Sequence, residues 1–399
     1  MGVAPSDAWS SGVGSPQRRH LAWIILGFGM VYSLTATWGL DANVDVIAAA
    51  LPAWSLVERG TITLDHLAGV NPWIVESAIG FVSNRPPGLS AVALPAYLIT
   101  SPDAFTNAPA TATAVIVAVG ALVALYFVLC RVVDERTALL GVVVMGLGTS
   151  TWSVSADALW PHGPGQLFAA LGLLALSSTR HFVAGTAMGA ALLIRPVTAA
   201  ATAALGLLES VRSRSWRPVI GLGIPSVAAL AVLLAYNRIV FGRASLTGGY
   251  QGEFADRLTT SGATEWLGNF ARMLTSAENG LLLWSPFVVV GVVGMALSWR
   301  GLPGWVRSAA VAALVYLALH ARLNRASGGV PFGYRYPLES LMLAAPALTL
   351  GIVRVFSSGR IGAMLVRFSV GLSVALQLAL VFLLECENIP NTEVTCSFF

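Results

Sequence analysis

Long apolar segments alternate with short polar connections along most of the chain. About eleven segments are apolar enough to enter a membrane, although several are short or interrupted by Pro or Gly. They comprise residues 21–40, 86–99, 110–130, 138–154, 165–176, 182–208, 219–236, 280–299, 306–319, 338–353 and 361–384. The pattern predicts an all-α fold, a polytopic bundle of transmembrane helices.

One of these segments can contain two helices. The segment at 182–208 includes Arg195-Pro196, and proline interrupts a helix. The predicted bundle therefore has about 10–13 helices. We expect residues 21–385 to form one membrane domain, between a disordered cytoplasmic N-terminus at 1–20 and a short extracytoplasmic tail at 386–399.

The first polar break, at residues 40–65, opens with two acids. If Asn43 caps a helix, the spacing of Asp41 and Asp45 places both carboxylates near one face at its start. Residues 46–57 then predict a helix that is too short to cross a bilayer and suits the membrane interface. We expect a long first extracytoplasmic loop carrying an interfacial helix. The alternative is a solvated loop whose acids only favour the helix dipole.

Composition supports this class of protein and excludes others. Hydrophobic residues make up 56% of the chain and charged residues 11%, against about 25% charged residues in soluble domains. Every basic side chain except histidine is an arginine, and the formal net charge is +4. No basic run carries interleaved aromatic residues, so we expect no nucleic-acid partner.

Arginine-rich connections predict the cytoplasmic side of the membrane. The clearest markers are Arg18, Arg19, the run at 212–217, Arg354, Arg360 and Arg367. Arg131 and Arg136 also look cytoplasmic. They share that side only if the segment at 86–99 is re-entrant or the segment at 182–208 is two helices.

The three cysteines predict different environments. Cys130 ends an apolar segment and is expected to be a buried thiol. Cys386 and Cys396 enclose a short polar stretch near the C-terminus. If that stretch is extracytoplasmic, they can form a disulfide; the alternative is two unpaired thiols.

Three ionisable residues interrupt apolar surroundings in the middle of the chain. Asp157 and His162 lie between two apolar segments, and Arg195 lies inside one. Charged groups at membrane depth are costly and usually line a cavity or pair with one another. We expect Arg195 to hold a lipid phosphate, to pair with Asp157, or to extend to the membrane interface.

A late motif, GYRYP, places Arg335 between two tyrosines, the first of which is Tyr334. This arrangement can bind a phosphate or a sugar, but it is also typical of an aromatic belt at the membrane interface. The chain contains no phosphate-binding loop, no HExxH and no persuasive catalytic triad. No metal site is indicated, although carboxylates could still hold a divalent ion.

Together these motifs resemble the GT-C class of membrane glycosyltransferases, which use polyprenyl-phosphate sugars outside the cytoplasm. The resemblance lies in the acid-bearing loop with Asp41, Asp45 and LPAWSLVERGTITLD, and in RPPG, which begins at Arg85. It continues in the motifs DALWPHG, IRPVT, GLLLWSP and GYRYPLE. The resemblance is to a compact form without the soluble C-terminal domain of many members.

The resemblance implies transfer of a sugar from a polyprenyl-phosphate donor to an envelope glycolipid or polysaccharide. The enzyme would be mannosyl- or arabinosyltransferase-like and inverting, in the inner (plasma) membrane, with its site facing outward. Its catalytic carboxylate would be Asp45 or Asp41, with Asp45 favoured by its distance from LPAWSL. The implied substrate-binding residues are Asp157, His162, Arg85, Arg195, Tyr334 and Arg335.

Two other functions fit parts of the pattern. A transporter or flippase of a lipid-linked sugar would line its path with Arg195 and Asp157. The chain lacks the internal repeat typical of many transporters, which favours catalysis. A non-catalytic membrane scaffold would not depend on these charged residues.

Overall fold

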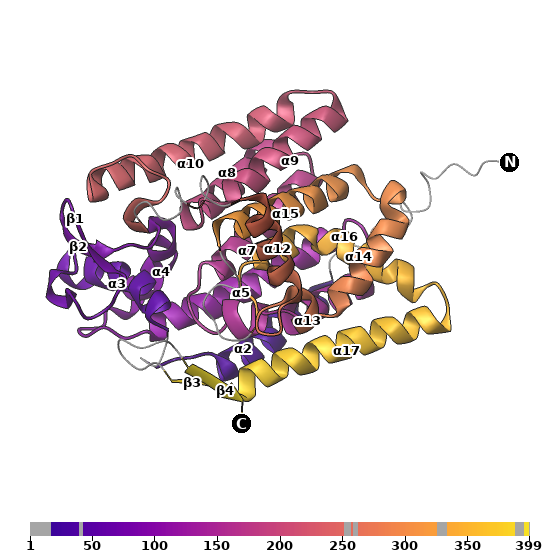
Figure 1. Cartoon of the computed structure of the whole chain (residues 1–399), viewed down its shortest axis with the longest axis horizontal. Coiled ribbons are helices and arrows are strands. Elements are labelled where there is room, and N and C mark those ends of the chain that lie inside the picture. The colour runs from indigo at the N-terminus through magenta and orange to yellow at the C-terminus, as the bar shows by residue number, and fades with distance from the viewer. Residues whose placement is uncertain are drawn as a thin grey trace.

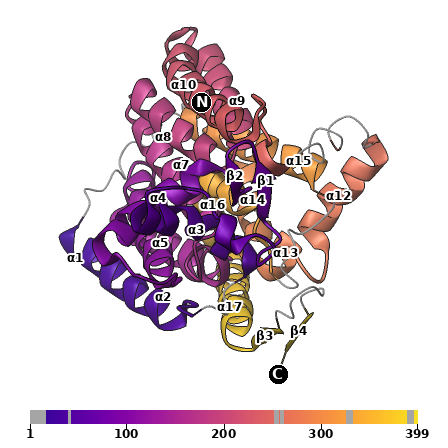
Figure 2. The same cartoon turned by 90° about the vertical axis from the view of Figure 1, so that its left-hand side faces the viewer.

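A computed structural model represents the chain (Figure 1). It describes residues 17–39, 43–250, 257, 262–324, 333–387 and 395–398; Asp41 is outside these ranges. Most helices lie side by side along the long axis of the molecule, and α3, α4, β1 and β2 gather at one end (Figures 1 and 2).

The N-terminal part contains one continuous helical run and the first polar loop. The run consists of α1 (Arg18–Trp23), η2 (Ile24–Phe28) and α2 (Gly29–Thr35). The loop folds into α3 (Val44–Arg59), η3 (Asp65–Leu67), the antiparallel strands β1 (Ile74–Ser77) and β2 (Gly80–Ser83), and α4 (Pro87–Thr100). The helix expected at 46–57 is confirmed, and Asn43 caps it by accepting a hydrogen bond from the Asp45 N–H, at 2.9 Å.

The rest of the chain is mainly helical. The next elements are α5 (Ala108–Leu129), α6 (Glu135–Leu147), η4 (Thr151–Ser155), α7 (His162–Ser177), α8 (His181–Ile194), α9 (Thr198–Ser213), α10 (Arg217–Phe241) and η5 (Gly248–Tyr250). They are followed by α12 (Ala263–Thr275), α13 (Leu281–Trp284), α14 (Phe287–Ser298), η6 (Trp299–Gly301), α15 (Gly304–Leu323), α16 (Leu338–Phe356), α17 (Arg360–Phe382), β3 (Leu384–Glu387) and β4 (Thr395–Phe398). In the register of β3 and β4, Cys386 lies opposite Cys396.

The helices confirm the predicted multi-pass membrane bundle. By length and composition, five helices in the described residues could cross a membrane: α5, α10, α15, α16 and α17. Three shorter apolar helices cover residues 87–100, 181–194 and 287–301. Glycines let α14 and α16 approach closely, because a Cβ added to Gly294 or Gly351 would collide with the backbone of the other helix.

The long apolar segment at 182–208 is two helices. Arg195, which ends α8, has extended backbone angles (φ −142°, ψ 101°). A following proline disfavours helical angles in the preceding residue, and Pro196 therefore explains the break. The chain turns there, and α9 begins at Thr198.

The first loop leaves and re-enters the bundle at the same end. Thr111, in the first turn of α5, donates a hydrogen bond to the carbonyl of Thr37, just beyond α2, at 2.8 Å. At the opposite end, the ring of His20 lies 2.8 Å from the hydroxyl of Tyr126 in the last turn of α5. The segment at 86–99 therefore belongs to a loop that makes no net crossing, and Arg131, just beyond α5, shares an end with Arg18.

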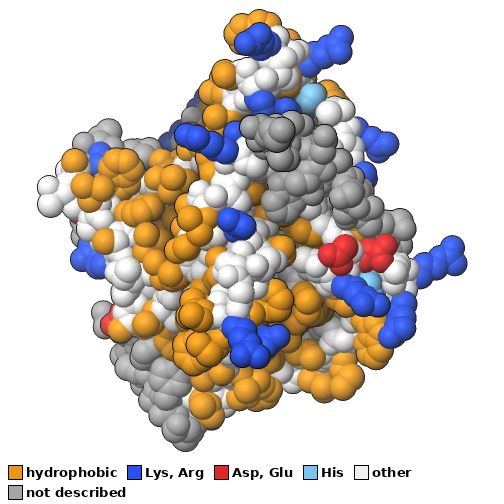
Figure 3. Space-filling view, turned by 90° about the vertical axis from the view of Figure 1, so that its right-hand side faces the viewer, with side chains coloured by type: hydrophobic (Ala, Val, Ile, Leu, Met, Phe, Trp, Pro, Cys, Tyr) orange, Lys and Arg blue, Asp and Glu red, His pale blue; other side chains and the backbone are white. Residues whose placement is uncertain are grey.

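Other arginines gather at that same end, on the right of Figure 1. The Arg212 side chain packs against Gly304 at the start of α15, and Arg300 and Arg354 line one groove. Figure 3 shows arginines, in dark blue, spread over the face at this end. Lysine would have the same colour, but the chain has none. The segment at 86–99 makes no net crossing, and the segment at 182–208 is two helices. The arginine-rich connections can therefore all lie on one side of the membrane.

A second hydrophobic core attaches the first loop to the bundle. It joins buried residues of α3 and α4, such as Trp54 and Leu89, to Leu159 and Ile194 of the bundle. Burial of side chains of this size contributes roughly 1.5–3 kcal/mol each. The loop is thus held firmly beside the starts of α7 and α9.

Candidate active site

Asp45 lies at the start of α3, where its carboxylate faces two arginines. Its Oδ1 is 2.6 Å from Nη2 of Arg85, and its Oδ2 is 3.3 Å from Nη1 of Arg335. The first turn of a helix favours a carboxylate, because the unpaired N–H groups there carry partial positive charge. Residues separated by 40 and 290 positions in the sequence thus meet at one carboxylate.

Aromatic rings flank both guanidinium groups. Arg85 lies 4.5 Å from the ring centre of Trp73, and it donates a hydrogen bond to the hydroxyl of Tyr250. Arg335 lies 4.6 Å from the ring centre of Trp160. Such contacts stabilise a cation and fix the plane of the guanidinium. We call these residues together the Asp45 site: Asp45, Arg85, Arg335, Trp73, Trp160 and Tyr250.

The Asp45 site contains buried hydrogen-bond donors that have no partner among the described residues. Within the described residues, Nε of Arg85, Nε of Arg335 and Nε1 of Trp73 are buried without a hydrogen-bond partner. Buried donors of this kind cost about 1–3 kcal/mol each when unsatisfied. Two guanidinium groups and one carboxylate also leave a positive charge. The arrangement is therefore suited to an oxyanion such as a phosphate.

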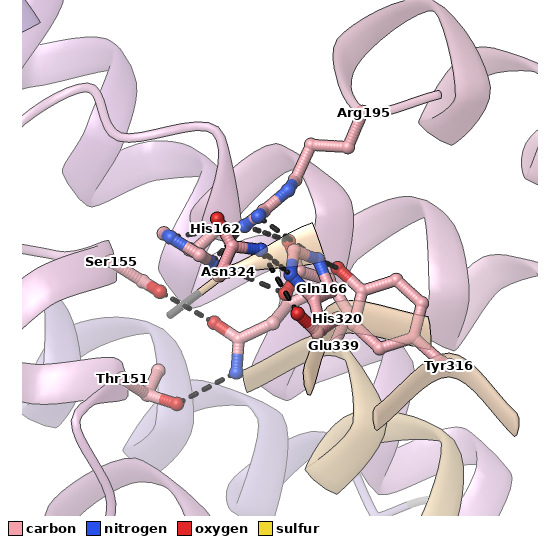
Figure 4. Close-up of polar contacts among 9 residues, drawn as sticks. All are labelled: Thr151, Ser155, His162, Gln166, Arg195, Tyr316, His320, Asn324 and Glu339. Carbon is pink, nitrogen blue, oxygen red and sulfur yellow. Dashed lines mark hydrogen bonds and ion pairs between the residues drawn. The ribbon is translucent and has the colours of Figure 1, made fainter. Parts of the chain in front are cut away.

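A second charged cluster lies deeper in the bundle (Figure 4). Glu339, in the first turn of α16, lies 3.1 Å from Nη1 of Arg195 and 3.2 Å from Nδ1 of His162. Nη2 of Arg195 lies 3.1 Å from Nε2 of His320. We call Glu339, Arg195, His162 and His320 the Glu339 network. The expected pairing of Arg195 with Asp157 is wrong: the acid that pairs with it is Glu339.

Asp157 occupies a different environment. Its Oδ1 accepts hydrogen bonds from the hydroxyl of Thr37, at 2.8 Å, and from the Thr37 N–H, at 3.2 Å. Burial raises the pKa of Asp157 to about 6, and the two hydrogen bonds only partly oppose that shift. The carboxyl therefore joins the end of the first helical run to the turn before α7.

The structure sorts the predicted residues into groups. Asp45, Arg85 and Arg335 meet in the Asp45 site, whereas His162 and Arg195 belong to the Glu339 network. Tyr334 points elsewhere and is buried, with its hydroxyl 2.6 Å from Oγ of Ser285. The proposed role of Asp41 lies outside the described residues.

Sequence reasoning missed several members of these groups. Glu339 opens an apolar segment, and the argument applied to Arg195, that a charge in such surroundings needs a partner, also applies to it. Trp73, Tyr250 and His320 had no comparable signal, because an aromatic ring or a histidine beside a membrane is common. Among the described residues, no group of three His, Cys, Asp or Glu side chains is arranged to hold a metal ion.

Comparisons with known proteins identify the fold. The sequence matches no family model and no curated protein. The structure is similar to ArnT from Cupriavidus metallidurans bound to undecaprenyl phosphate, with a TM-score of 0.55 and 12% identity over 91% of this chain and 70% of that one. It is also similar to the archaeal oligosaccharyltransferase AglB from Archaeoglobus fulgidus in complex with an inhibitory peptide and a dolichol-phosphate, with a TM-score of 0.53 and 14% identity.

These similarities show the fold of the chain. The chain is a multi-pass membrane helix bundle, and it shares its fold with ArnT and AglB. The match to AglB includes 90% of this chain and 56% of the AglB chain. This chain therefore spans just over half the length of that protein.

Proposed function

We propose that this protein transfers a sugar from a polyprenyl-phosphate donor to a glycolipid or polysaccharide acceptor of the cell envelope. The observation that carries the proposal is the Asp45 site: one carboxylate between two arginines whose buried Nε donors have no hydrogen-bond partner among the described residues. The GT-C fold supports it, because one similar structure holds undecaprenyl phosphate and another holds a dolichol-phosphate.

In the proposed reaction, the donor phosphate binds Arg85 and Arg335, and the acceptor hydroxyl approaches Asp45. Binding of phosphate to both guanidinium groups frees the carboxylate oxygens of Asp45 to accept the hydroxyl proton. The acceptor oxygen forms a bond to the anomeric carbon while the bond from that carbon to the phosphate oxygen breaks. The lipid phosphate leaves with the electron pair, and the arginines stabilise its charge.

We propose that the reaction is inverting and that the site faces outward. A base that activates the acceptor on the side opposite the leaving phosphate leads to in-line displacement. The Asp45 site lies at the end of the bundle opposite the arginine-rich end, and arginine-rich ends face the cytoplasm. We therefore infer a plasma-membrane enzyme that works outside the cytoplasm, with mannose or arabinose as the sugars to test first.

The test is sugar transfer by the purified full chain in liposomes. The donors are polyprenyl-phosphate mannose and polyprenyl-phosphate arabinose, and the acceptor is a lipid extract from a strain that lacks the protein. Asp45→Asn keeps the size of the side chain but removes the base, so we expect transfer to fall by roughly 100-fold or more. Asp103→Asn changes an exposed acid in the same loop and serves as the matched control.

Two outcomes would contradict the proposal. Full activity of folded Asp45→Asn would remove the carboxylate from the reaction. Movement of labelled lipid across the bilayer without any product would favour the flippase instead.

A further inference from the structure

The short segment 333–337, just before α16, carries Arg335 to the Asp45 site. Its start is anchored: the Gly333 N–H donates to the carbonyl of Glu278, at 2.8 Å, and Tyr334 is 1% exposed. Gly333 has a φ of +77°, which favours glycine. Arg335 comes directly after Tyr334. The direction of the Arg335 side chain therefore also depends on the residue that holds the other end of the segment.

Tyr336 is the anchor at that other end. Its ring is stacked on the ring of His320, with 4.9 Å between centroids and 18° between planes. The guanidinium groups of Arg195 and Arg335 each lie 5.5 Å from the centre of the same ring. Tyr336 therefore lies between the Glu339 network and the arginine that reaches Asp45.

The Glu339 network is built to hold Tyr336 and has little left for a ligand. The charges of Arg195 and Glu339 cancel, and the Glu339 side chain is 1% exposed. The two nitrogens at the end of the Arg195 guanidinium already contact Glu339, His162 and His320. Pro196 also restricts the backbone of Arg195. These residues form a rigid support and do not present a free positive charge.

We propose that Tyr336, Arg195 and Glu339 are positioning residues, which hold the Arg335 guanidinium in the orientation that binds the donor phosphate. This inference rests on the proposed function, and it changes the expected role of Arg195 from phosphate binding to support. A guanidinium binds phosphate well only when its plane is aligned with the oxygens. Loss of the Tyr336 ring removes one of the two rings that contact the Arg335 guanidinium, and the Trp160 ring remains.

The experiment measures binding of undecaprenyl phosphate to the purified full chain, with undecaprenol, which lacks the phosphate, as the control ligand. Tyr336→Leu removes the ring, and Tyr336→Phe keeps it. We expect Tyr336→Leu to weaken undecaprenyl phosphate binding about tenfold, the effect of one misaligned charge-assisted contact. Tyr336→Phe should bind within about twofold of the wild type, and undecaprenol binding should not change in either variant.

The decisive comparison is a double-mutant cycle with Arg335→Gln. If Tyr336 acts through Arg335, the double variant binds undecaprenyl phosphate no more weakly than Arg335→Gln alone. Additive losses would show that Tyr336 acts independently and would overturn the inference. If Arg335→Gln weakens binding but Tyr336→Leu does not, the positioning role alone fails. If Arg335→Gln has no effect, the proposed function and this inference both fail.

A second variant disturbs the support without altering a charged or aromatic group. A methyl group at Gly165 of α7 would lie 2.8 Å from Oε1 of Glu339, so Gly165→Ala must displace that carboxylate. We expect Gly165→Ala to reduce binding of undecaprenyl phosphate in the same direction as Tyr336→Leu. Gly120→Ala, whose methyl would meet Leu167 at an ordinary 3.5 Å, is the matched control. Equal binding by folded Gly165→Ala and Gly120→Ala would contradict the positioning role of Glu339.

Discussion

Two arginines share one carboxylate at Asp45, so a positive charge and several donors are left over. Arg85 uses Nη2 for Asp45 and Nη1 for Tyr250, while its Nε has no partner within the described residues. Lysine could keep the charge, but it has no Nε–H beside the terminal donors and no plane to stack on Trp73. Replacing Arg85 with lysine therefore tests the geometry of the proposed phosphate binding.

For Arg85→Lys, we expect binding of undecaprenyl phosphate to weaken about tenfold, because paired donors and the stacking plane are lost while the charge stays. The measurement is a titration of the purified variant and the wild type. Arg59→Lys, at the exposed end of α3, is the control. Unchanged affinity of Arg85→Lys would mean that only charge matters at this position.

Asp157 provides a test that depends on pH. Its folded-state pKa of about 6 lies above the ordinary value of 3.8, so the native protein holds a proton between these values that the unfolded chain has released. Stability contributed by that proton is present at low pH and is lost as the pH rises through this range. Asp157→Asn cannot ionise and keeps an oxygen that accepts from Thr37.

We therefore expect the stability of Asp157→Asn relative to the wild type to increase as the pH rises from about 4 to about 6.5 and then to stay constant. The maximum gain is about 3 kcal/mol, because the folded-state pKa of about 6 lies well above the ordinary value of 3.8. Thermal unfolding in detergent at several pH values measures it, with Asp103→Asn as the control. If the stability difference between Asp157→Asn and the wild type does not vary with pH, the pKa of Asp157 is not raised in the folded protein.

At the scale of the elements, glycine contacts between α14 and α16 and the proline break after α8 shape the bundle. The break at Arg195-Pro196 was predictable, because proline acts on its immediate neighbour. The close approach of Gly294 and Gly351 was not predictable, since it depends on which helices become neighbours. Local rules therefore located many of the helix boundaries but did not pair the helices.

Gly351→Ala tests this packing. The added methyl would collide with the carbonyl of Gly291 in α14, so the helices must separate. We expect a loss of about 1–3 kcal/mol, the usual cost of overpacking, seen as a lower thermal midpoint in detergent. Gly371→Ala, which has open space around its Cβ in α17, should unfold close to the wild-type midpoint. Equal midpoints for both variants would exclude a tight contact at Gly351.

Across the whole molecule, the sequence indicated many of the important residues singly but not their grouping. Asp45, Arg85 and Arg335 each drew attention as charges beside apolar segments, yet their meeting depends on contacts over 40 and 290 positions. The sequence predicts that Arg195 needs a partner, but it does not single out Glu339, because an acid at the start of a helix has an ordinary local explanation. Long-range pairing is the information that a single sequence lacks.

The arrangement of basic ends predicts the orientation in the membrane. Single cysteines placed in a background without Cys130, Cys386 and Cys396 can be labelled in intact cells with a membrane-impermeant maleimide. Asp103 lies at the end of the bundle that carries the Asp45 site, and we expect Asp103→Cys to be labelled. Ser358 lies between α16 and α17, and we expect no labelling of Ser358→Cys. Permeabilised cells provide the control, in which both should react. The reverse pattern in intact cells would place the Asp45 site in the cytoplasm.

The contact between Thr37 and Thr111 has a consequence for how the protein can change over time. Because the intervening stretch departs from and returns to one point, insertions or deletions in its exposed turns leave the order and direction of all later helices untouched. Closing a longer loop costs only about 0.6 kcal/mol for each doubling of its length. Homologues can therefore remodel this loop while the membrane-embedded frame stays the same.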